Sequence, residues 1–275
     1  MTPRKQLVVN ADDFGLTPDV NQGIVEAHQR GILTAATLMA NSAAFDDAVR
    51  LAHEAPTLDI GCHLVLIGGR SLLTGRLLPQ NAAQLLAAIA GRDIRIYDEL
   101  AAQVQRIADA GIRPTHLDTH KHTHLLPPVL EAVARLGHES GIRWVRRPFD
   151  FPLTSIHGAV PRLMRVANSA MGLFRSRVHR VLEQHGCRTT DHFAGFQFTG
   201  RLHGAELVQL LGVLPEGSTE LMCHPGWCGD ALRAARTRLK QSRQRELEAL
   251  VAKETRDALD RNGIELVNYR ELEEP

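Results

Sequence analysis

Short apolar runs alternate with helical patterns along almost the whole chain. The apolar runs are typical of buried strands, and most are followed by a segment in which apolar residues recur every three or four positions. The predicted strands cover residues 7–9, 34–40, 59–66, 114–120, 142–145, 193–198, 219–225 and 264–268. Strands that alternate with helices pair in parallel, because each helix returns the chain to the same edge of the sheet. The pattern therefore predicts an α/β fold.

The predicted helices follow the strands closely. They cover residues 20–30, 45–54, 82–90, 97–110, 125–139, 204–214 and 233–261, and residues 152–186 contain less regular helical pieces. The chain shows no linker, repeat or low-complexity segment, so we expect a single domain spanning residues 1–275. This length suits a (β/α) barrel of typically ~250 residues. An open doubly wound sheet is the alternative, but the Gly-x-Gly-x-x-Gly fingerprint of dinucleotide-binding folds does not follow the first strand.

The composition is that of an ordinary globular enzyme. Hydrophobic residues make up 44% of the chain and charged residues 23%, and the net charge of +1 gives no indication of a nucleic-acid partner. The first residues are polar, and no apolar run is long enough to span a membrane. The four cysteines form no Cys-x-x-Cys pair, and their spacing does not fit a structural zinc site. We therefore expect a reduced, cytoplasmic protein.

Two adjacent carboxylates, Asp12 and Asp13, follow the first predicted strand. Neighbouring side chains of a regular strand point to opposite faces, so the two can serve one site only where the strand ends and the backbone turns. Gly15 permits such a turn. Crowded carboxylates repel each other unless a cation or a shared proton offsets their charge. A cation site is one interpretation, and an ordinary aspartate turn after a strand is the other.

Polar side chains also lie near the ends of several later strands: His63, Asp118, His120, Arg146, Arg147 and His224. In a (β/α) barrel the carboxyl ends of the strands meet on one face, where active sites lie. We therefore expect these side chains to meet in one pocket, although they are far apart in the sequence. Taken alone, a histidine in an apolar strand is often a hydrogen-bonded core residue, and arginines at a strand end often form a salt bridge at the surface.

The densest signal is the run from Asp118 to His124, in which every second residue is Asp or His. If the run is extended, these alternate residues share one face. A carboxylate together with neutral imidazoles is a common ligand set for a divalent ion. Not every histidine of the run can be a ligand, so some of them would contact the ligands or the substrate instead. A solvated, histidine-rich loop is the alternative.

Four motifs along the chain carry a resemblance to a known family. They are Asn-Ala-Asp-Asp-Phe-Gly at 10–15, Gly-Cys-His at 61–63, Thr-His-Leu-Asp-Thr-His-Lys-His-Thr-His at 115–124 and Met-Cys-His-Pro at 222–225. In this order they resemble the YdjC-like carbohydrate deacetylase family, which includes the chitooligosaccharide deacetylases, and the resemblance covers nearly the whole chain. It implies a distorted, TIM-like (β/α) barrel and a hydrolase that removes acetyl groups from N-acetylated sugars with the help of a metal ion.

The resemblance also implies roles for individual residues. The ligands of one divalent metal ion would be Asp13, His63 and His120. The catalytic base would be Asp12, and the catalytic acid would be His224. The residues expected to contact the ligands or the substrate are Asp118, His122, His124, Arg146 and Arg147. One carboxylate and two imidazoles suit Zn²⁺, while completion of the shell by water oxygens also permits Mg²⁺.

The expected substrate is an N-acetylated sugar, either a chitooligosaccharide or a glycoconjugate that contains N-acetylglucosamine. One branch of the family acts in hopanoid lipid biosynthesis, and residues 68–95 and 152–201 match the family less distinctly. Contact with a membrane is expected only for a glycolipid substrate. Residues 161–180 mix arginines with apolar side chains. Such a segment is either an amphipathic surface that faces a membrane or a helix whose apolar side packs against the core. The basic residues of 233–245 are predicted to lie on a solvated helix face.

Two other functions remain open from the sequence. One is a different metal-dependent amidohydrolase or a phosphoesterase on a related barrel, which a second metal bound by His122 or His124 would favour. The other is a non-catalytic protein that binds sugar or metal, which would need neither the base Asp12 nor the acid His224. The sequence also leaves open whether the chain forms a homodimer.

Overall fold

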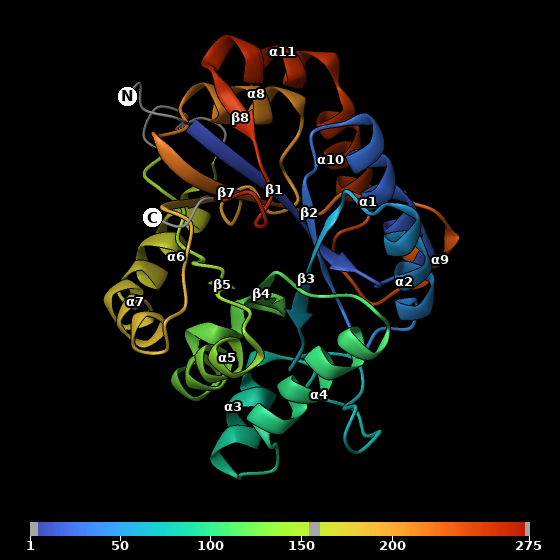
Figure 1. Ribbon diagram of the computed structural model, residues 1–275, viewed down its shortest axis with the longest axis vertical. Coiled ribbons are helices and arrows are strands. Elements are labelled where there is room, and N and C mark those ends of the chain that lie inside the picture. Colours follow the sequence, from blue (N-terminus) through green and yellow to red (C-terminus); the bar gives the residue numbers. More distant parts are fainter. Residues whose placement is uncertain (1–4, 154–159, 273–275) are drawn as a thin grey trace.

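A curled sheet of parallel strands forms the centre of the structure, a computed structural model that describes residues 5–153 and 160–272 (Figure 1). Within these residues the sheet has eight strands. They are β1 (Lys5–Phe14), β2 (Ala35–Leu38), β3 (Asp59–Leu64), β4 (His116–Thr119), β5 (Trp144–Val145), β6 (His192–Ala194), β7 (Gly217–Cys223) and β8 (Ile264–Leu266). Each of them overlaps a stretch that the apolar pattern predicts as a strand.

The strands lie in the order β5-β4-β3-β2-β1-β7-β6, and β8 pairs with β1. The pairs are parallel. Isolated bridges connect the two ends of this order: Trp144 of β5 pairs with Arg188, and Asp150 pairs with Phe193 of β6. The sheet therefore curls almost into a closed ring, and the predicted α/β fold with a distorted barrel is confirmed.

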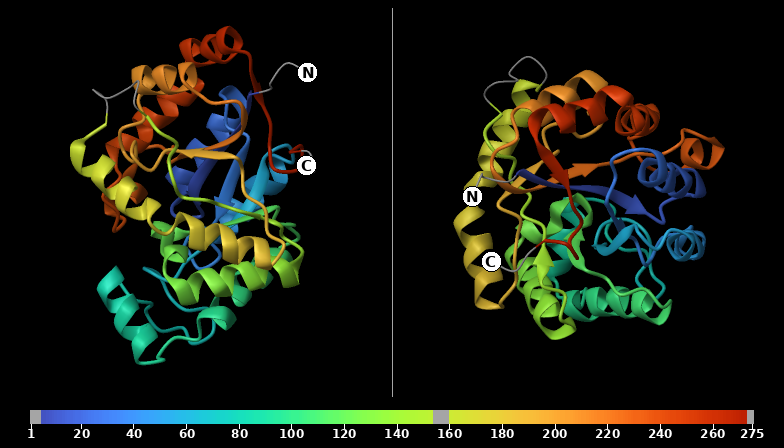
Figure 2. Two further views of the ribbon diagram at one scale, coloured as in Figure 1. Left: turned by 90° about the vertical axis from the view of Figure 1, so that its left-hand side faces the viewer. Right: turned by 45° about the horizontal axis from the view of Figure 1, so that its top comes forward.

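Helices cover the outer side of the sheet, as Figure 1 and Figure 2 show. They are α1 (Pro18–Arg30), α2 (Phe45–Glu54), α3 (Ala82–Ala90), α4 (Ile96–Asp109), α5 (Pro127–Ser140), α6 (Arg162–Gly172), α7 (Arg175–Gln184), α8 (Gly204–Gly212), α9 (Asp230–Ala234), α10 (Gln241–Val251) and α11 (Lys253–Asn262), with a 3-10 helix, η1 (His120–Leu125), after β4. The part of the irregular helical region at 154–159 lies outside the described residues. In the described ranges, no helix has the length and apolar character needed to cross a membrane.

The single helix predicted for residues 233–261 is wrong, because this region forms α9, α10 and α11. The ammonium group of Lys240 folds back on the end of α9 and donates hydrogen bonds to the carbonyls of Leu232 and Arg233. Between α10 and α11, Ala252 has an extended backbone with a ψ of 142°. No Gly or Pro marks either break, so the sequence carries no local signal for them.

The central strand, β1, is buried along most of its length. It pairs with β2, β7 and β8, and the apolar side chains of Leu7 and Val9 belong to the main core. Its register with β7 places Ala11 beside Cys223. The residues that follow these two, Asp12 and His224, therefore lie side by side at the same edge of the sheet.

Gly61 of β3 leaves room for an imidazole ring inside the barrel. A Cβ atom at this position would lie 2.5 Å from Nε2 of His116. The His116 ring stacks on Tyr269, and its Nε2 lies 2.9 Å from Oδ1 of Asn10. Asn10 in turn donates a hydrogen bond of 3.2 Å to Oδ1 of Asp12. This buried chain of contacts supports Asp12 from inside the barrel.

Candidate metal centre and active site

The two adjacent carboxylates lie buried together at the end of β1. The register of β1 shifts between Ala11 and Phe14, and Asp13 has a φ of 68°, in the left-handed region. This irregular backbone, which Asp tolerates better than most residues, lets Asp12 and Asp13 serve the same site. In the following turn, the backbone carbonyl of Asp13 accepts a hydrogen bond from Leu16. The turn thus uses the backbone of Asp13, and a simple aspartate turn does not explain the two carboxylates.

Asp13, His63 and His120 form a compact group of ligand atoms. Oδ1 of Asp13 lies 3.4 Å from Nε2 of His63 and 3.1 Å from Nδ1 of His120, and the two nitrogens are 3.2 Å apart. Nδ1 of His63 lies 2.7 Å from Asp118, so in the neutral ring the proton is on Nδ1 and the lone pair is on Nε2. Oδ1 of Asp13 is buried without a hydrogen bond of good geometry. Lone pairs that converge in this way need a cation, so the donor set fits a divalent metal ion.

The electrostatics of this group also favour positive charge. Burial lowers the pKa of His63, but the carboxylates around it, Asp118 above all, outweigh burial and raise the pKa to about 10. Burial raises the pKa of Asp13, but Arg243 and the two histidines outweigh burial and hold the pKa well below its usual range. The site therefore stabilises a bound proton or cation next to an ionised carboxylate.

Arg146, which follows β5, is a buried cation that holds three carboxylates. Its guanidinium donates two hydrogen bonds to Asp12, of 2.7 and 2.8 Å. It also lies 2.6 Å from Asp118 and 2.7 Å from Glu220. Burial raises the pKa of Asp12, but Arg146 outweighs burial and keeps the pKa well below its usual value. Asp12 is therefore an ionised carboxylate with a fixed orientation.

Arg147, the next residue, lies outside this group of side chains. Its Nη1 donates a hydrogen bond to the backbone carbonyl of Asp191. Because successive side chains of an extended segment point to opposite sides, Arg146 and Arg147 cannot both face the site.

His224 lies between two carboxylates. Its Nε2 is 4.0 Å from Oδ2 of Asp12, and its Nδ1 is 4.0 Å from Oε2 of Glu246. Glu246 also accepts a hydrogen bond of 2.6 Å from the backbone N–H of His224. Burial lowers the pKa of His224 to about 4 and raises the pKa of Glu246 to about 7. At neutral pH the imidazole is neutral, so it can accept a proton on one side and release it again.

In the Glu246→Gln variant, the free energy of unfolding is expected to fall less steeply with rising pH than in the unmodified chain. A carboxyl with a pKa near 7 in the folded protein and a usual value of 4.5 stabilises the folded state fully below pH 4.5. This contribution falls as the pH rises through 7, by at most about 1.4 kcal/mol per pH unit. Urea unfolding from pH 4.5 to 8 measures the effect. The matched control is Glu248→Gln, an exposed position on the same helix, and equal slopes for both variants would contradict the prediction.

Comparison with known proteins identifies the family. Residues 6–261 match the model of a family described as YdjC-like protein. The chain belongs to the YdjC-like family. A carbohydrate deacetylase of Brevibacillus brevis is 33% identical over 275 residues, which cover 97% of this chain and 99% of the relative. A carbohydrate deacetylase of Mus musculus is 33% identical over 316 residues, which cover 98% of this chain and 96% of the relative.

A solved structure agrees with the fold of this YdjC-like chain. It is a crystal structure from Enterococcus faecalis, of a protein named for a proposed cellobiose-phosphate cleavage. The two structures have a TM-score of 0.75 and 28% sequence identity, over 98% of this chain and all of the other. The family expected from the four sequence motifs is therefore confirmed by sequence and by fold.

The histidine run of the YdjC-like chain is not extended. β4 ends at Thr119, and η1 follows with left-handed backbone at Lys121 and His122. Oγ1 of Thr119 lies 2.5 Å from Nδ1 of His124, while the ring of His122 packs edge-on against Phe196. Burial lowers the pKa of His124 to about 3 and holds that of His122 well below its usual value. Both are therefore neutral, packed side chains, in contrast to His120, which faces Asp13.

The sequence interpretation missed Arg243 and Glu246 of α10, which lie one turn apart and are buried. Arg243 donates to Oδ2 of Asp13, so the prediction of a solvated basic face is wrong at this position. A signal was present, because these two residues fall on the same helical stripe as Leu247 and Leu250, which are core residues. A charged residue on an apolar stripe indicates a buried ion pair.

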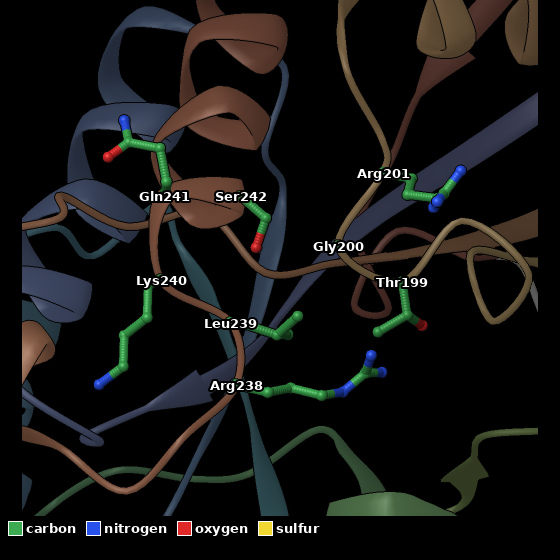
Figure 3. Close-up of a pocket in the computed structure, with 8 residues that line it drawn as sticks. All are labelled: Thr199, Gly200, Arg201, Arg238, Leu239, Lys240, Gln241 and Ser242. Carbon is green, nitrogen blue, oxygen red and sulfur yellow. The ribbon is translucent and has the colours of Figure 1, made fainter.

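A surface cavity of about 480 Å³ lies beside the centre (Figure 3). It is lined by residues 199–201 and 238–242. Gly200 at its wall donates a backbone hydrogen bond to Glu246, and Ser242 directly precedes Arg243. Figure 3 shows the side chain of Arg238 extending toward Thr199 and that of Arg201 pointing away from residues 238–242. The cavity is therefore adjacent to the two residues of α10 that contact Asp13 and His224.

Proposed function

We propose that the chain is a metal-dependent N-deacetylase that removes the acetyl group from an N-acetylated sugar, a chitooligosaccharide or an N-acetylglucosamine-containing glycoconjugate. One observation carries the proposal: a convergent Asp-His-His group lies next to a second carboxylate, Asp12, that itself faces an imidazole. Metal-assisted hydrolysis of an amide uses these elements together, namely a site for a metal ion, a base and an acid. The full-length similarity to carbohydrate deacetylases supports the sugar acetamide as the substrate.

The metal site proposed here consists of Asp13, His63 and His120, which would hold one divalent ion, Zn²⁺ or Mg²⁺. When bound, such an ion polarises the acetyl carbonyl and acidifies a water molecule. Asp118 fixes the ring of His63 through Nδ1 and so directs Nε2 toward the ion. Arg243 neutralises the second oxygen of Asp13 and leaves the first oxygen for the ligand role.

Asp12 is the proposed base that takes a proton from the attacking water. It is ionised and immobile, because Arg146 binds both of its oxygens and Asn10 binds one of them. A base that is held in one orientation does not have to be reorganised during the reaction. Its low pKa makes it a weak base, so the water must be acidified before the transfer becomes favourable.

His224 is the proposed acid that protonates the departing nitrogen. An amine anion is a very poor leaving group, so the C–N bond breaks only as the nitrogen gains a proton. Nε2 of His224 faces Asp12, so the proton taken from water can pass from Asp12 to the imidazole and from there to the amine. The carboxyl of Glu246 on the opposite side stabilises the imidazolium that forms on the way. The products are acetate and the free amine.

The two other functions suggested by the sequence have less support. Among the described residues, two groups could hold a metal: Asp13, His63 and His120, and Asp12, His63 and Asp118. They share His63, and both carboxylates of the second group are paired with Arg146. Neither group includes His122 or His124 of η1. These are the residues that the two-metal alternative would have used as ligands. A non-catalytic binding protein would not need the paired Asp12 and His224.

Acetate release from N-acetylglucosamine oligomers is expected to stop when the metal is removed and to return when Zn²⁺ or Mg²⁺ is added back. The polarisation of the carbonyl is lost with the ion, and the weak base Asp12 cannot compensate for it. Acetate is measured enzymatically on the purified protein before dialysis against a chelator, after it and after each metal is restored. Full activity of a protein shown to be metal-free would rule out the proposal. Short chitooligosaccharides and N-acetylglucosaminyl lipids, assayed side by side, define the substrate.

A further inference from the structure

The helix pair α6 and α7 carries five arginines and a single carboxylate, Glu183, near the end of α7. Residues 151–182 contain five arginines and no aspartate or glutamate. With 31 acidic residues in 275, a stretch of this length would carry about three or four on average. The chain as a whole has a net charge of only +1, so this helix pair is a locally basic region, as residues 233–245 are.

The same helix pair exposes large apolar side chains. Leu163 is 77% exposed, Val166 65%, Leu173 84% and Phe174 46%, which is half of the exposed large hydrophobic residues among those described. The first three follow each other at helical spacing, so they form one stripe along α6. Figure 1 and Figure 2 show α6 and α7 at the outer edge of the molecule. We call this stripe, together with Phe174, the α6 stripe.

The α6 stripe faces outward because the opposite side of α6 is already packed. Met164 and Met171 lie against the main core. Oδ1 of Asn168 accepts a hydrogen bond of 3.1 Å from the backbone N–H of Asp150. Asp150 lies four residues after Arg146, so the helix is tied to the segment that leads out of the active site. The packing therefore fixes which side of α6 is presented to solvent.

We propose that the α6 stripe and the arginines beside it are a docking surface for an anionic lipid bilayer. Leu163, Val166 and Leu173 enter the headgroup region, while Arg162, Arg177 and Arg180 contact the negative headgroups from their exposed positions. This role goes beyond deacetylation, because it needs no particular substrate and no metal.

Charge decides between a membrane and a second copy of the chain. A symmetric contact through the α6 stripe would bring the same five arginines of two copies face to face, with only Glu183 of each helix pair to offset them. An anionic bilayer offers both an apolar phase for the leucines and negative charge for the arginines.

Co-sedimentation with vesicles tests the docking surface on the full chain. We expect binding to vesicles of phosphatidylcholine with phosphatidylglycerol, weak binding to phosphatidylcholine alone, and loss of binding as salt is raised. Leu163→Ser with Leu173→Ser, and separately Arg177→Glu with Arg180→Glu, should weaken binding about tenfold or more. The matched controls are Leu77→Ser and Arg76→Glu with Arg92→Glu, exposed positions that lie outside α6 and α7, which should bind like the unmodified chain.

Two results would overturn the proposal. One is absence of binding to anionic vesicles at low salt, and the other is equal binding by the α6 variants and their controls. A dimer that the leucine variants convert to monomers, without vesicle binding, would identify a second copy as the occupant and reject the membrane. Circular dichroism and acetate release from a soluble oligomer confirm that each variant is folded, so a loss of vesicle binding reports the surface itself.

Discussion

Asp12→Asn is expected to abolish acetate release while the metal remains bound. The substitution keeps the size of the side chain and one oxygen, but it removes the carboxylate that we propose accepts the proton of the attacking water. Loss of a general base typically lowers the turnover rate by about 10²–10⁴-fold. Because Asp12 contacts Arg146 and lies outside the group of Asp13, His63 and His120, the affinity for the ion should change little.

The matched control is Asp13→Asn, the same chemical change one residue further along the chain. Here the ion should be lost, because Oδ1 of Asp13 faces both His63 and His120. Metal content by atomic emission and turnover under saturating metal separate the two variants. If Asp12→Asn loses the metal and Asp13→Asn keeps it, the roles of base and ligand are exchanged. If both variants retain full turnover, the site is elsewhere.

The sequence predicts the strands of this fold well, because a buried parallel strand is a continuous apolar run. It also predicts that polar residues at the strand ends converge, since that follows from parallel topology. The break between α10 and α11 could not be predicted in this way. It depends on an extended Ala252, and alanine is a strong helix former with no local preference for such a break.

For the site, sequence reasoning fails where a side chain is placed by tertiary packing. Spacing alone could not separate Asp12 from Asp13, because the partners that each carboxylate faces depend on a left-handed backbone at Asp13. Arg146 and Arg147 are chemically identical in the sequence, and only the direction of the chain after β5 distinguishes them. Arg243 lies on α10, 230 residues after Asp13 in the sequence. No local sequence pattern could therefore indicate that the two side chains are in contact.

Arg146→Met is expected to cause the largest loss of stability of any single substitution in the centre. It leaves three buried carboxylates, on Asp12, Asp118 and Glu220, without their shared cation. Removing one partner from a buried ion pair typically costs about 3–5 kcal/mol. Against a total stability of about 5–15 kcal/mol for a natural protein, this is a large fraction. Thermal and urea unfolding measure the change, and turnover should fall with it because Asp12 loses its fixed orientation.

Arg147→Met is the control for this prediction, because it makes the same chemical change at the next residue. Its side chain lies outside the centre and makes one hydrogen bond to a backbone carbonyl, so its effect on stability should stay near the ~1 kcal/mol of a single hydrogen bond. Addition of Glu220→Gln to Arg146→Met should recover part of the loss, because it removes one of the unpaired charges; burial already raises the pKa of Glu220 to about 7. Equal stabilities of the Arg146 and Arg147 variants would show that the guanidinium is not the cation that holds the three carboxylates together. If Glu220→Gln restores stability but not turnover, the two roles of Arg146 are separate. Arg146 would then stabilise the fold by neutralising buried carboxylates and, independently, would hold Asp12 in place for turnover.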